Sequence, residues 1–214
     1  MAIKPILFNT EMVRAILEGR KSCTRRLVKP QPDEKHTYQL GFVTDSTEKK
    51  EVGCFGFAAN EYGGSIQYVK PPYRYAPGDI LYVRETWKKA PNGYYYYEDW
   101  QRNDIADVTK WKPSIHMPKE AARIWLKVID VRVERLQEIS EDGAVKEGIY
   151  VANCKDCNAP FGCDACPDEG YNEIDEFVEL WNITVKKSDI DRYGWNANPW
   201  VWVIKFERCE KPEE

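Results

Sequence analysis

The sequence predicts an α+β fold, in which a small β-barrel carries helices packed at its ends and one metal-binding excursion. Three observations support this prediction. Short β-rich runs outnumber amphipathic helical segments, as they do in small barrels. In residues 124–133 apolar and polar side chains alternate, and the phase of the alternation slips by one residue after Val128. Such a slip indicates a bulge or a sharp bend, which a barrel needs at its corners. The third observation is a compact group of four cysteines at 154–166.

The composition is that of one globular domain covering residues 1–214. Hydrophobic residues make up 43% of the chain and charged residues 31%, so the chain has enough apolar material for a core. No apolar run approaches the ~18 residues of a membrane span, and we therefore expect no membrane partner. The N-terminal residues lack the apolar stretch of a signal peptide. From these observations we expect a cytoplasmic protein.

The order of the elements follows from local patterns. An extended segment at 5–8 leads into an amphipathic helix at 9–18, for which Asn9 or Thr10 serves as the cap. Gly19 stands where the glycine after a helix belongs. We expect the first and last strands to pair. Farther along we expect strands at 38–43, 51–58 and 65–69 in an irregular β insertion at about 31–75, a hairpin of 80–87 with 94–97, one helical turn at 118–122, helices at 138–147 and 172–181, and a closing strand at 199–206.

A basic loop follows the first helix at residues 19–26. Within it, Lys21 stands three residues before Thr24. A hydroxyl beside a lysine amine forms a nucleophile–base pair if the lysine is desolvated and its pKa falls. Backbone N–H groups of the same loop are candidates for stabilising an oxyanion. The alternative is a solvated basic turn, which is common after helices.

The charge distribution favours an anionic ligand at one place. The formal net charge is −4, yet residues 1–30 hold seven basic and two acidic side chains. Arg25 and Arg26 belong to this group, and guanidinium groups suit phosphate and other anions. A mildly acidic chain with one basic loop does not resemble a protein that coats DNA with a broad face.

The cysteine group predicts a structural zinc site in an excursion at about 150–170. Two CxxC pairs separated by five residues are typical of a closed tetrahedral site with four thiolates. Iron is a second metal for the same thiolates, and four reduced cysteines in a loop are the alternative without metal. Cys23, Cys54 and Cys209 are not expected to be ligands. The predicted ligands are Cys154, Cys157, Cys163 and Cys166.

Two motifs resemble the ASCH domain family, which belongs to the PUA-like β-barrel superfamily. The first is Gly19-x-Lys21-x-x-Thr24-x-Arg26, and the second is the run Pro77-Gly78-Asp79-Ile80-Leu81-Tyr82-Val83-Arg84-Glu85. Residues 112–135 and 195–200 resemble a phage or prophage branch of the family. The resemblance implies a PUA-like barrel and a link to RNA or nucleoside chemistry.

The resemblance also implies an activity. Small bacterial members of the family are amidohydrolases that remove the acetyl group of N4-acetylcytidine. Lys21 and Thr24 match two of their catalytic positions, and Glu147 matches the third, with Glu141 as its rival. The expected partner is therefore RNA or a modified nucleoside. The alternative without catalysis is that Lys21 and Glu147 form a buried ion pair that ties the loop to the barrel.

Two further functions stay open. The chain fits a non-catalytic RNA- or DNA-binding module of a phage or prophage that uses Arg25, Arg26, Lys29 and Arg84. In that case Trp87 is a candidate for stacking on a base, although packing in the core is the simpler interpretation. A phage assembly factor whose barrel binds only protein is the third hypothesis.

Overall fold

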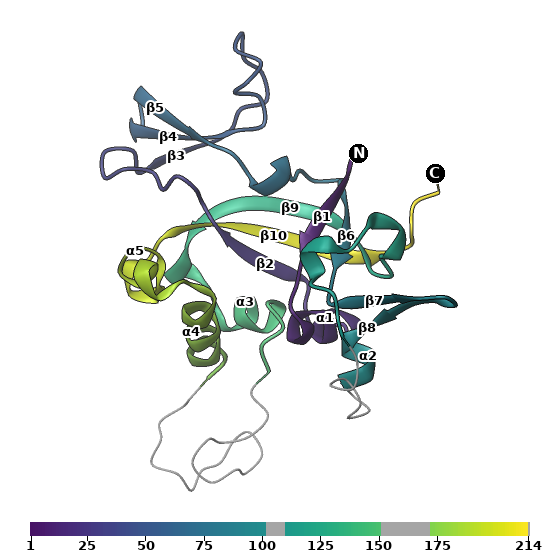
Figure 1. Ribbon diagram of the computed structural model, residues 1–214. Coiled ribbons are helices and arrows are strands. Elements are labelled where there is room, and N and C mark those ends of the chain that lie inside the picture. Colours follow the sequence, from purple (N-terminus) through teal and green to yellow (C-terminus); the bar gives the residue numbers. More distant parts are fainter. Residues whose placement is uncertain (102–109, 151–171, 214) are drawn as a thin grey trace, which may run out of the picture.

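The computed structural model describes residues 1–101, 110–150 and 172–213. These residues form a mixed α+β fold with a five-stranded sheet, a three-stranded sheet and a two-stranded hairpin (Figure 1). The strand order of the large sheet is β1-β6-β9-β10-β2, in which β1 and β6 are parallel and the other neighbours antiparallel. The strands are β1 (Ile3–Leu7), β2 (Cys23–Leu27), β3 (Tyr38–Phe42), β4 (Phe55–Asn60), β5 (Gly63–Val69), β6 (Ile80–Arg84), β7 (Trp87–Ala90), β8 (Gly93–Tyr96), β9 (Trp125–Arg135) and β10 (Trp200–Cys209).

Short helices connect the strands. Asn9 caps α1 by accepting a hydrogen bond from the backbone N–H of Met12, and Ser140 and Asn172 cap α3 and α4 in the same way. The longest helix in the described part of the chain, α4, has 12 residues, which is too short to cross a bilayer. The α-helices are α1 (Thr10–Leu17), α2 (Tyr97–Gln101), α3 (Glu141–Lys146), α4 (Glu173–Thr184) and α5 (Ile190–Tyr193), and 3₁₀ turns lie at Pro72–Arg74, Ser114–His116, Lys119–Ala121, Leu136–Glu138, Lys187–Asp189 and Trp195–Ala197.

Strand β10 is buried on both faces. Trp200 and Trp202 point into the main core, whereas Val201 and Val203 point into a second core under α3 and α4. This alternation follows from the two-residue period of a strand. The large sheet therefore separates two apolar layers, and the predicted helices at 138–147 and 172–181 form one of them, as α3 and α4.

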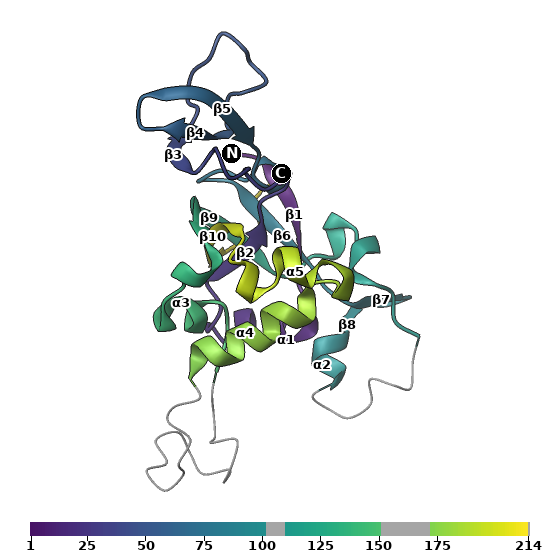
Figure 2. The same cartoon turned by 90° about the vertical axis from the view of Figure 1, so that its left-hand side faces the viewer.

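The three-stranded sheet lies on the opposite side of the large sheet from α3 and α4 (Figures 1 and 2). It occupies residues 38–69 of the expected insertion. The ring of Phe57 lies 5.0 Å from that of Trp200, and the ring of Phe55 lies 6.1 Å from that of Trp202. Because these aromatic pairs are buried, the small sheet completes the main core.

The predicted bulge lies at residue 129. Asp130 pairs with Lys205 and Val128 pairs with Phe206, so that Ile129 has no partner on β10. Ile129 is 39% exposed, while Val128 and Val131 on either side are buried. The extra residue explains why the apolar phase of the sequence slips there, and this prediction is confirmed.

Two pairing predictions are wrong, and the closed barrel is not confirmed. The first and last strands do not pair, because β1 pairs with β6 and β10 lies between β9 and β2. Residues 80–87 and 94–97 do not form one hairpin, because the chain turns at the buried Glu85 and a separate hairpin of β7 and β8 begins at Trp87. Within the described residues the large sheet is open, with β1 and β2 as its edges.

Candidate functional site

Residues 19–22 of the predicted basic loop are hydrogen-bonded to α1 and α3, whereas residues 23–26 form part of β2 and not of a loop. Helix α1 ends as predicted, and Gly19 has a φ of 78°, which favours glycine. The carbonyl of Ala15 accepts hydrogen bonds from the N–H groups of Arg20 and Lys21, and that of Lys146 accepts one from Ser22. The N–H of Gly19 also donates to a helix carbonyl. The loop N–H groups from 19 to 22 are therefore occupied, and the expectation that they stabilise an oxyanion is wrong for these four.

Lys21 and Glu147 meet in the interior, although 126 residues separate them in the sequence. The Nζ of Lys21 donates to Oε2 of Glu147 at 2.7 Å and to the main-chain carbonyl of Glu147, also at 2.7 Å. The side chains are 0% and 5% exposed, respectively. The pair ties the basic loop to the C-terminal end of α3.

Gly148 allows this close approach. Its φ is 94°, and a Cβ at this position would lie 2.7 Å from the Cβ of Ala15 in α1. A side chain at 148 would therefore push α3 away from α1 and move the carboxylate of Glu147 away from Lys21. Arg20 also holds the two segments together, since its Nη1 donates to the carbonyl of Gly148 at 2.6 Å.

Burial and charge act in opposite directions on Lys21. Complete burial lowers the pKa of Lys21, because the charged form loses its hydration. The carboxylate of Glu147 opposes this change, and the guanidinium of Arg26 adds to it. The net direction is a lowered pKa, which raises the population of the neutral amine.

Arg25 holds the other oxygen of Glu147. Its Nη1 lies 3.1 Å from Oε1 of Glu147, while its Nε and Nη2 donate to Oε1 of Glu134 at 2.9 and 2.6 Å. Burial opposes the charge of Arg25, but the two carboxylates outweigh burial and raise its pKa. The carboxylate of Glu147 is thus fixed from both sides.

Thr24 lies on β2 with its side chain completely buried. Its Oγ1 makes no hydrogen bond to any protein group in the described part of the chain. Because strand side chains alternate, Thr24 shares a face of β2 with Arg26 and not with Cys23 or Arg25. Buried hydroxyls without a partner are uncommon, and each needs a physical explanation.

Phe8 connects the face of Thr24 with Lys21. The Nζ of Lys21 and the guanidinium carbon of Arg26 each lie 5.5 Å from the centre of the Phe8 ring. The Nη2 of Arg26 also donates to the carbonyl of Leu7 at 3.0 Å. The structure thus brings Lys21, Arg26 and Glu147 into one cluster, with Thr24 on the adjoining strand and no hydrogen bond between Thr24 and Lys21.

Two neighbouring residues, Cys23 and Glu141, are less suited than Thr24 and Glu147 to the predicted roles of nucleophile and carboxylate. Cys23 points to the second core, and burial raises the pKa of its thiol to about 11, which disfavours the reactive thiolate. Glu141 lies in the exposed first turn of α3 and forms none of these contacts. Of the two carboxylates considered from the sequence, Glu147 is therefore the one beside Lys21.

The side chains of the remaining predicted binding residues contact other groups, although the main-chain carbonyl of Arg84 accepts a hydrogen bond from the N–H of Phe8 at 3.3 Å. Arg84 ends β6, where it pairs in register with Leu7, and its Nε donates to the carbonyl of Met117 at 2.8 Å. Trp87 is buried with Met117 and Ala121 in a small apolar cluster. This burial favours packing over base stacking for Trp87.

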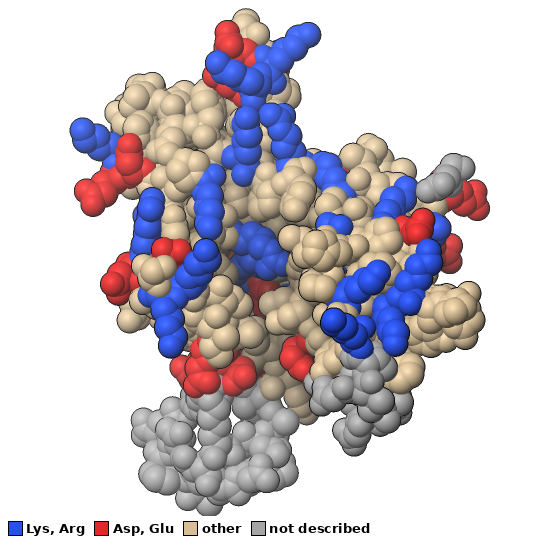
Figure 3. All heavy atoms as spheres, viewed as in Figure 1, with Lys and Arg blue, Asp and Glu red and all other residues tan. Residues whose placement is uncertain are grey.

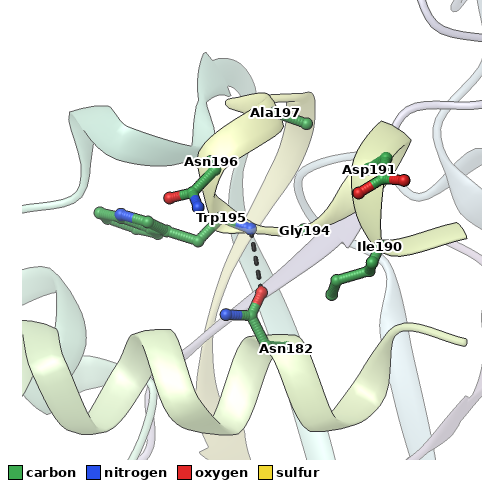
Figure 4. A pocket seen from close by; sticks show the side chains of 7 residues that line it. All are labelled: Asn182, Ile190, Asp191, Gly194, Trp195, Asn196 and Ala197. Atoms are coloured by element: carbon green, nitrogen blue, oxygen red, sulfur yellow. Dashed lines mark hydrogen bonds between the residues drawn. The ribbon is translucent and has the colours of Figure 1, made fainter. Parts of the chain in front are cut away.

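The surface is hollowed in several places, and one pocket reaches Glu147. Figure 3 shows a hollow near the middle of the face, with basic side chains deep inside it and acidic atoms directly below them. A pocket of about 320 Å³ between α1 and α4 is lined in part by Glu147 and Arg20. Another of about 240 Å³ lies away from the cluster, where Asn182 of α4 accepts a hydrogen bond from the N–H of Trp195 (Figure 4).

The predicted zinc ligands Cys154, Cys157, Cys163 and Cys166 lie outside the described residues. Among the residues that the structure does describe, no group of three His, Cys, Asp or Glu side chains is arranged to hold a metal ion. The zinc site stays a prediction from the sequence.

Sequence reasoning missed Glu134, Phe8 and Gly148. Each lies outside the basic loop, and the contact between Arg25 and Glu134 spans 109 positions. A signal for Glu134 was present, because an acidic residue at the end of a long apolar strand can pair with a buried arginine.

Comparison of the chain with models of known protein families, with curated proteins and with solved structures finds no match.

Proposed function

We propose that the chain is an amidohydrolase of the ASCH type that removes the acyl group from an N4-acylated cytidine. Two observations carry this proposal: the buried pair of Lys21 and Glu147, and the hydroxyl of Thr24, which is buried without a hydrogen-bond partner three residues farther along the chain. A structural role alone accounts for an ion pair. It does not account for a hydroxyl that is buried without a partner.

The proposed roles of Lys21 and Thr24 follow from the number of hydrogen atoms on the Lys21 amine. A neutral lysine has two N–H bonds and one lone pair. If both N–H bonds donate to Glu147, as the two 2.7 Å contacts allow, the lone pair is left to accept a proton. The proposal assigns that proton to the hydroxyl of Thr24, so that Lys21 is the general base and Thr24 the nucleophile.

The reaction then has two balanced steps. In the first, Oγ1 of Thr24 bonds to the acyl carbon, the hydroxyl proton passes to Lys21, and the C–N bond breaks as the leaving amine takes that proton. In the second, a water molecule attacks the threonine ester and releases the carboxylic acid and the free hydroxyl. Glu147 positions Lys21, and Arg25 positions Glu147.

The buried charge favours an anionic transition state. The cluster holds three basic side chains and two acidic ones, so that its net charge is positive when Lys21 is protonated. The basic side chains are Lys21, Arg25 and Arg26, and the acidic ones are Glu134 and Glu147. Arg26 lies on the same face of β2 as Thr24. Its guanidinium is therefore the group that the proposal assigns to the oxyanion in place of the loop N–H groups.

The second candidate function is a non-catalytic RNA- or DNA-binding module. It is favoured by the basic side chains that Figure 3 shows on both sides of the hollow. Such a module needs no nucleophile, and its affinity falls with salt because phosphate contacts release counterions.

The two candidates are separated by one assay. Purified full-length protein and its Thr24→Ala variant are incubated with N4-acetylcytidine and a panel of other N-acyl nucleosides, and free nucleoside and released acid are quantified. Binding to a labelled RNA is measured in parallel. The hydrolase predicts turnover by the native protein and none by the variant. The absence of turnover on every acylated nucleoside, with salt-sensitive RNA binding intact in the variant, would favour the binding module instead.

A further inference from the structure

A basic pocket adjoins the proposed site along β2. We call it the β2–α5 pocket, because it opens between the edge strand β2 and the segment that joins α4 to α5. Its volume is about 360 Å³. Arg26 and Lys29 line it from one side, and Lys186, Asp189 and Tyr193 line it from the other.

The pocket carries uncompensated positive charge. Among the described residues, Arg26, Lys29 and Lys186 form no ion pair with a carboxylate, whereas Arg25 is committed to Glu134 and Glu147. Asp189 is the single acidic residue that lines the pocket. Cations that line a cavity without a carboxylate partner favour an anionic ligand.

The pocket also offers an aromatic surface. The Nζ of Lys29 lies 5.3 Å from the centre of the Tyr193 ring, and the guanidinium carbon of Arg192 lies 5.0 Å from it. Tyr193 is half-buried, with its main-chain carbonyl fixed by the indole N–H of Trp181 at 2.9 Å. An anchored ring between cations suits a ligand that combines phosphates with flat bases.

The pocket lies close to Thr24 along the main chain, and of the two arginines that line it, Arg26 shares the face of β2 on which the Thr24 side chain lies. Arg25 and Arg26 both line it and directly follow Thr24 on β2, and a strand rises ~3.3 Å per residue, so that the pocket begins within ~7 Å of Thr24 along the strand. Arg26 belongs to both places, since its guanidinium also stands over Phe8 beside Lys21.

We propose that the β2–α5 pocket binds a phosphate of the substrate backbone, and that the substrate is a single-stranded polynucleotide and not a free nucleoside. This inference rests on the proposed hydrolase function. The acylated base reaches Thr24 while a neighbouring phosphate lies between Lys29 and Lys186. Basic side chains stand on both sides of the hollow, over β7–β8 as well as near α5, which suits a chain that continues in both directions (Figures 1 and 3).

The binding arm of the test uses a short 5′-labelled single-stranded RNA that contains one N4-acetylcytidine. Its affinity is measured by fluorescence anisotropy at several salt concentrations for the native protein, a Lys29→Glu/Lys186→Glu variant and a control variant, Lys127→Glu, at an exposed position of β9. We expect the double variant to lose roughly tenfold or more in affinity and the magnitude of its salt slope to fall by ~0.7, the value for one lost phosphate contact on a single strand. We expect the control to match the native protein. Equal affinities and slopes for all three proteins would overturn the proposal.

The turnover arm separates this inference from the proposed function. We expect kcat/KM to be at least about tenfold higher for the acetylated RNA than for free N4-acetylcytidine, and the double variant to lose this advantage through KM. Equal kcat/KM for the two substrates, unchanged in the double variant, would overturn the inference while the hydrolase stands. If neither substrate is deacetylated, the proposed hydrolase fails, and with it the inference that the bound RNA is a substrate.

Discussion

The amine of Lys21 donates two hydrogen bonds to one residue, Glu147, through the carboxylate Oε2 and the main-chain carbonyl, each at 2.7 Å. The main-chain bond does not depend on the side chain at position 147. A substitution at position 147 can therefore change the charge next to the Lys21 amine while the main-chain bond still holds the amine in place. Replacement of the carboxylate changes the electrostatics of Lys21 and leaves one of its two anchors in place.

The first prediction concerns the pH dependence of turnover. In the proposed reaction Lys21 acts as a base only when neutral, so we expect the rate to rise with pH as the amine loses its proton. Because burial lowers the pKa of Lys21, the midpoint of this rise lies below the ordinary value of 10.5. The measurement is kcat/KM for N4-acetylcytidine across the pH range in which the protein stays folded. A rate that falls as pH rises through this range would contradict the role of Lys21 as base.

The Glu147→Gln variant moves the same midpoint. The carboxylate of Glu147 raises the pKa of Lys21 against the effect of burial, so its removal lowers that pKa further. We expect the midpoint of the rate profile to shift to lower pH than in the native protein, with a lower maximal rate because the amide has one acceptor oxygen and cannot accept from both Lys21 and Arg25. The pH profiles of the two proteins, measured side by side, check this. A shift to higher pH would mean that the charge of Glu147 does not act on the base.

A second ion-pair network is predicted to support the fold and not the chemistry. Arg123 contacts both carboxylate oxygens of Glu85 at 2.9 Å and stands over the ring of Tyr96. Glu85 is 2% exposed, and burial raises its pKa. Arg123→Met leaves this carboxylate buried without its partner, so we expect unfolding to become easier by ~3–5 kcal/mol, measured by denaturant titration.

The pH dependence of that loss has a definite sign. Glu85 binds its proton more tightly in the folded variant than in the unfolded chain, so the folded state loses stability as pH rises through the folded pKa. We therefore expect a larger loss at pH 8 than at pH 5. The control is Arg132→Met, whose guanidinium is about half exposed, so that its pairs with Asp130 and Glu134 are screened by water and worth ~0–1 kcal/mol. Equal losses in both variants would contradict the burial argument.

The fourth prediction concerns metal content. We expect one zinc ion per chain, bound by four thiolates at Zn–S distances of ~2.3 Å. Metal analysis of the reduced, purified protein checks this, and Cys157→Ser is expected to lower the zinc content. Zinc and iron together below about half an equivalent, with all cysteines reduced, would count against a four-thiolate site.

Local patterns predicted the local parts of the fold. The helical spacing before Gly19, the cap at Ser140 and the phase slip after Val128 each depend on neighbouring residues, and each reappears as α1, α3 and the bulge at Ile129. The pairing of strands was harder to predict, because a strand can end where a buried charged residue pairs with a residue far away in the sequence. Strand β6 ends one residue before Glu85, and Glu85 pairs with Arg123.

The site was predictable only in part for the same reason. The motif resemblance led to Lys21, Thr24 and Glu147, and the structure places the amine of Lys21 on Glu147. The local sequence offers an acidic residue at the end of β9 but does not say that Glu134 anchors Arg25, and it does not show that Gly148 lets α3 approach α1. These contacts depend on tertiary packing, which a motif does not encode.

The most direct test of the central claim is the Thr24→Val variant, which replaces the hydroxyl with a methyl group of similar shape. Because the hydroxyl is buried without a hydrogen-bond partner in the described protein, its loss should leave the unfolding free energy unchanged or raise it by up to ~1–3 kcal/mol. Turnover of N4-acetylcytidine should disappear, while Thr24→Ser retains part of it. A stable Thr24→Val protein with kcat/KM within about tenfold of the native value would show that Thr24 is not the nucleophile.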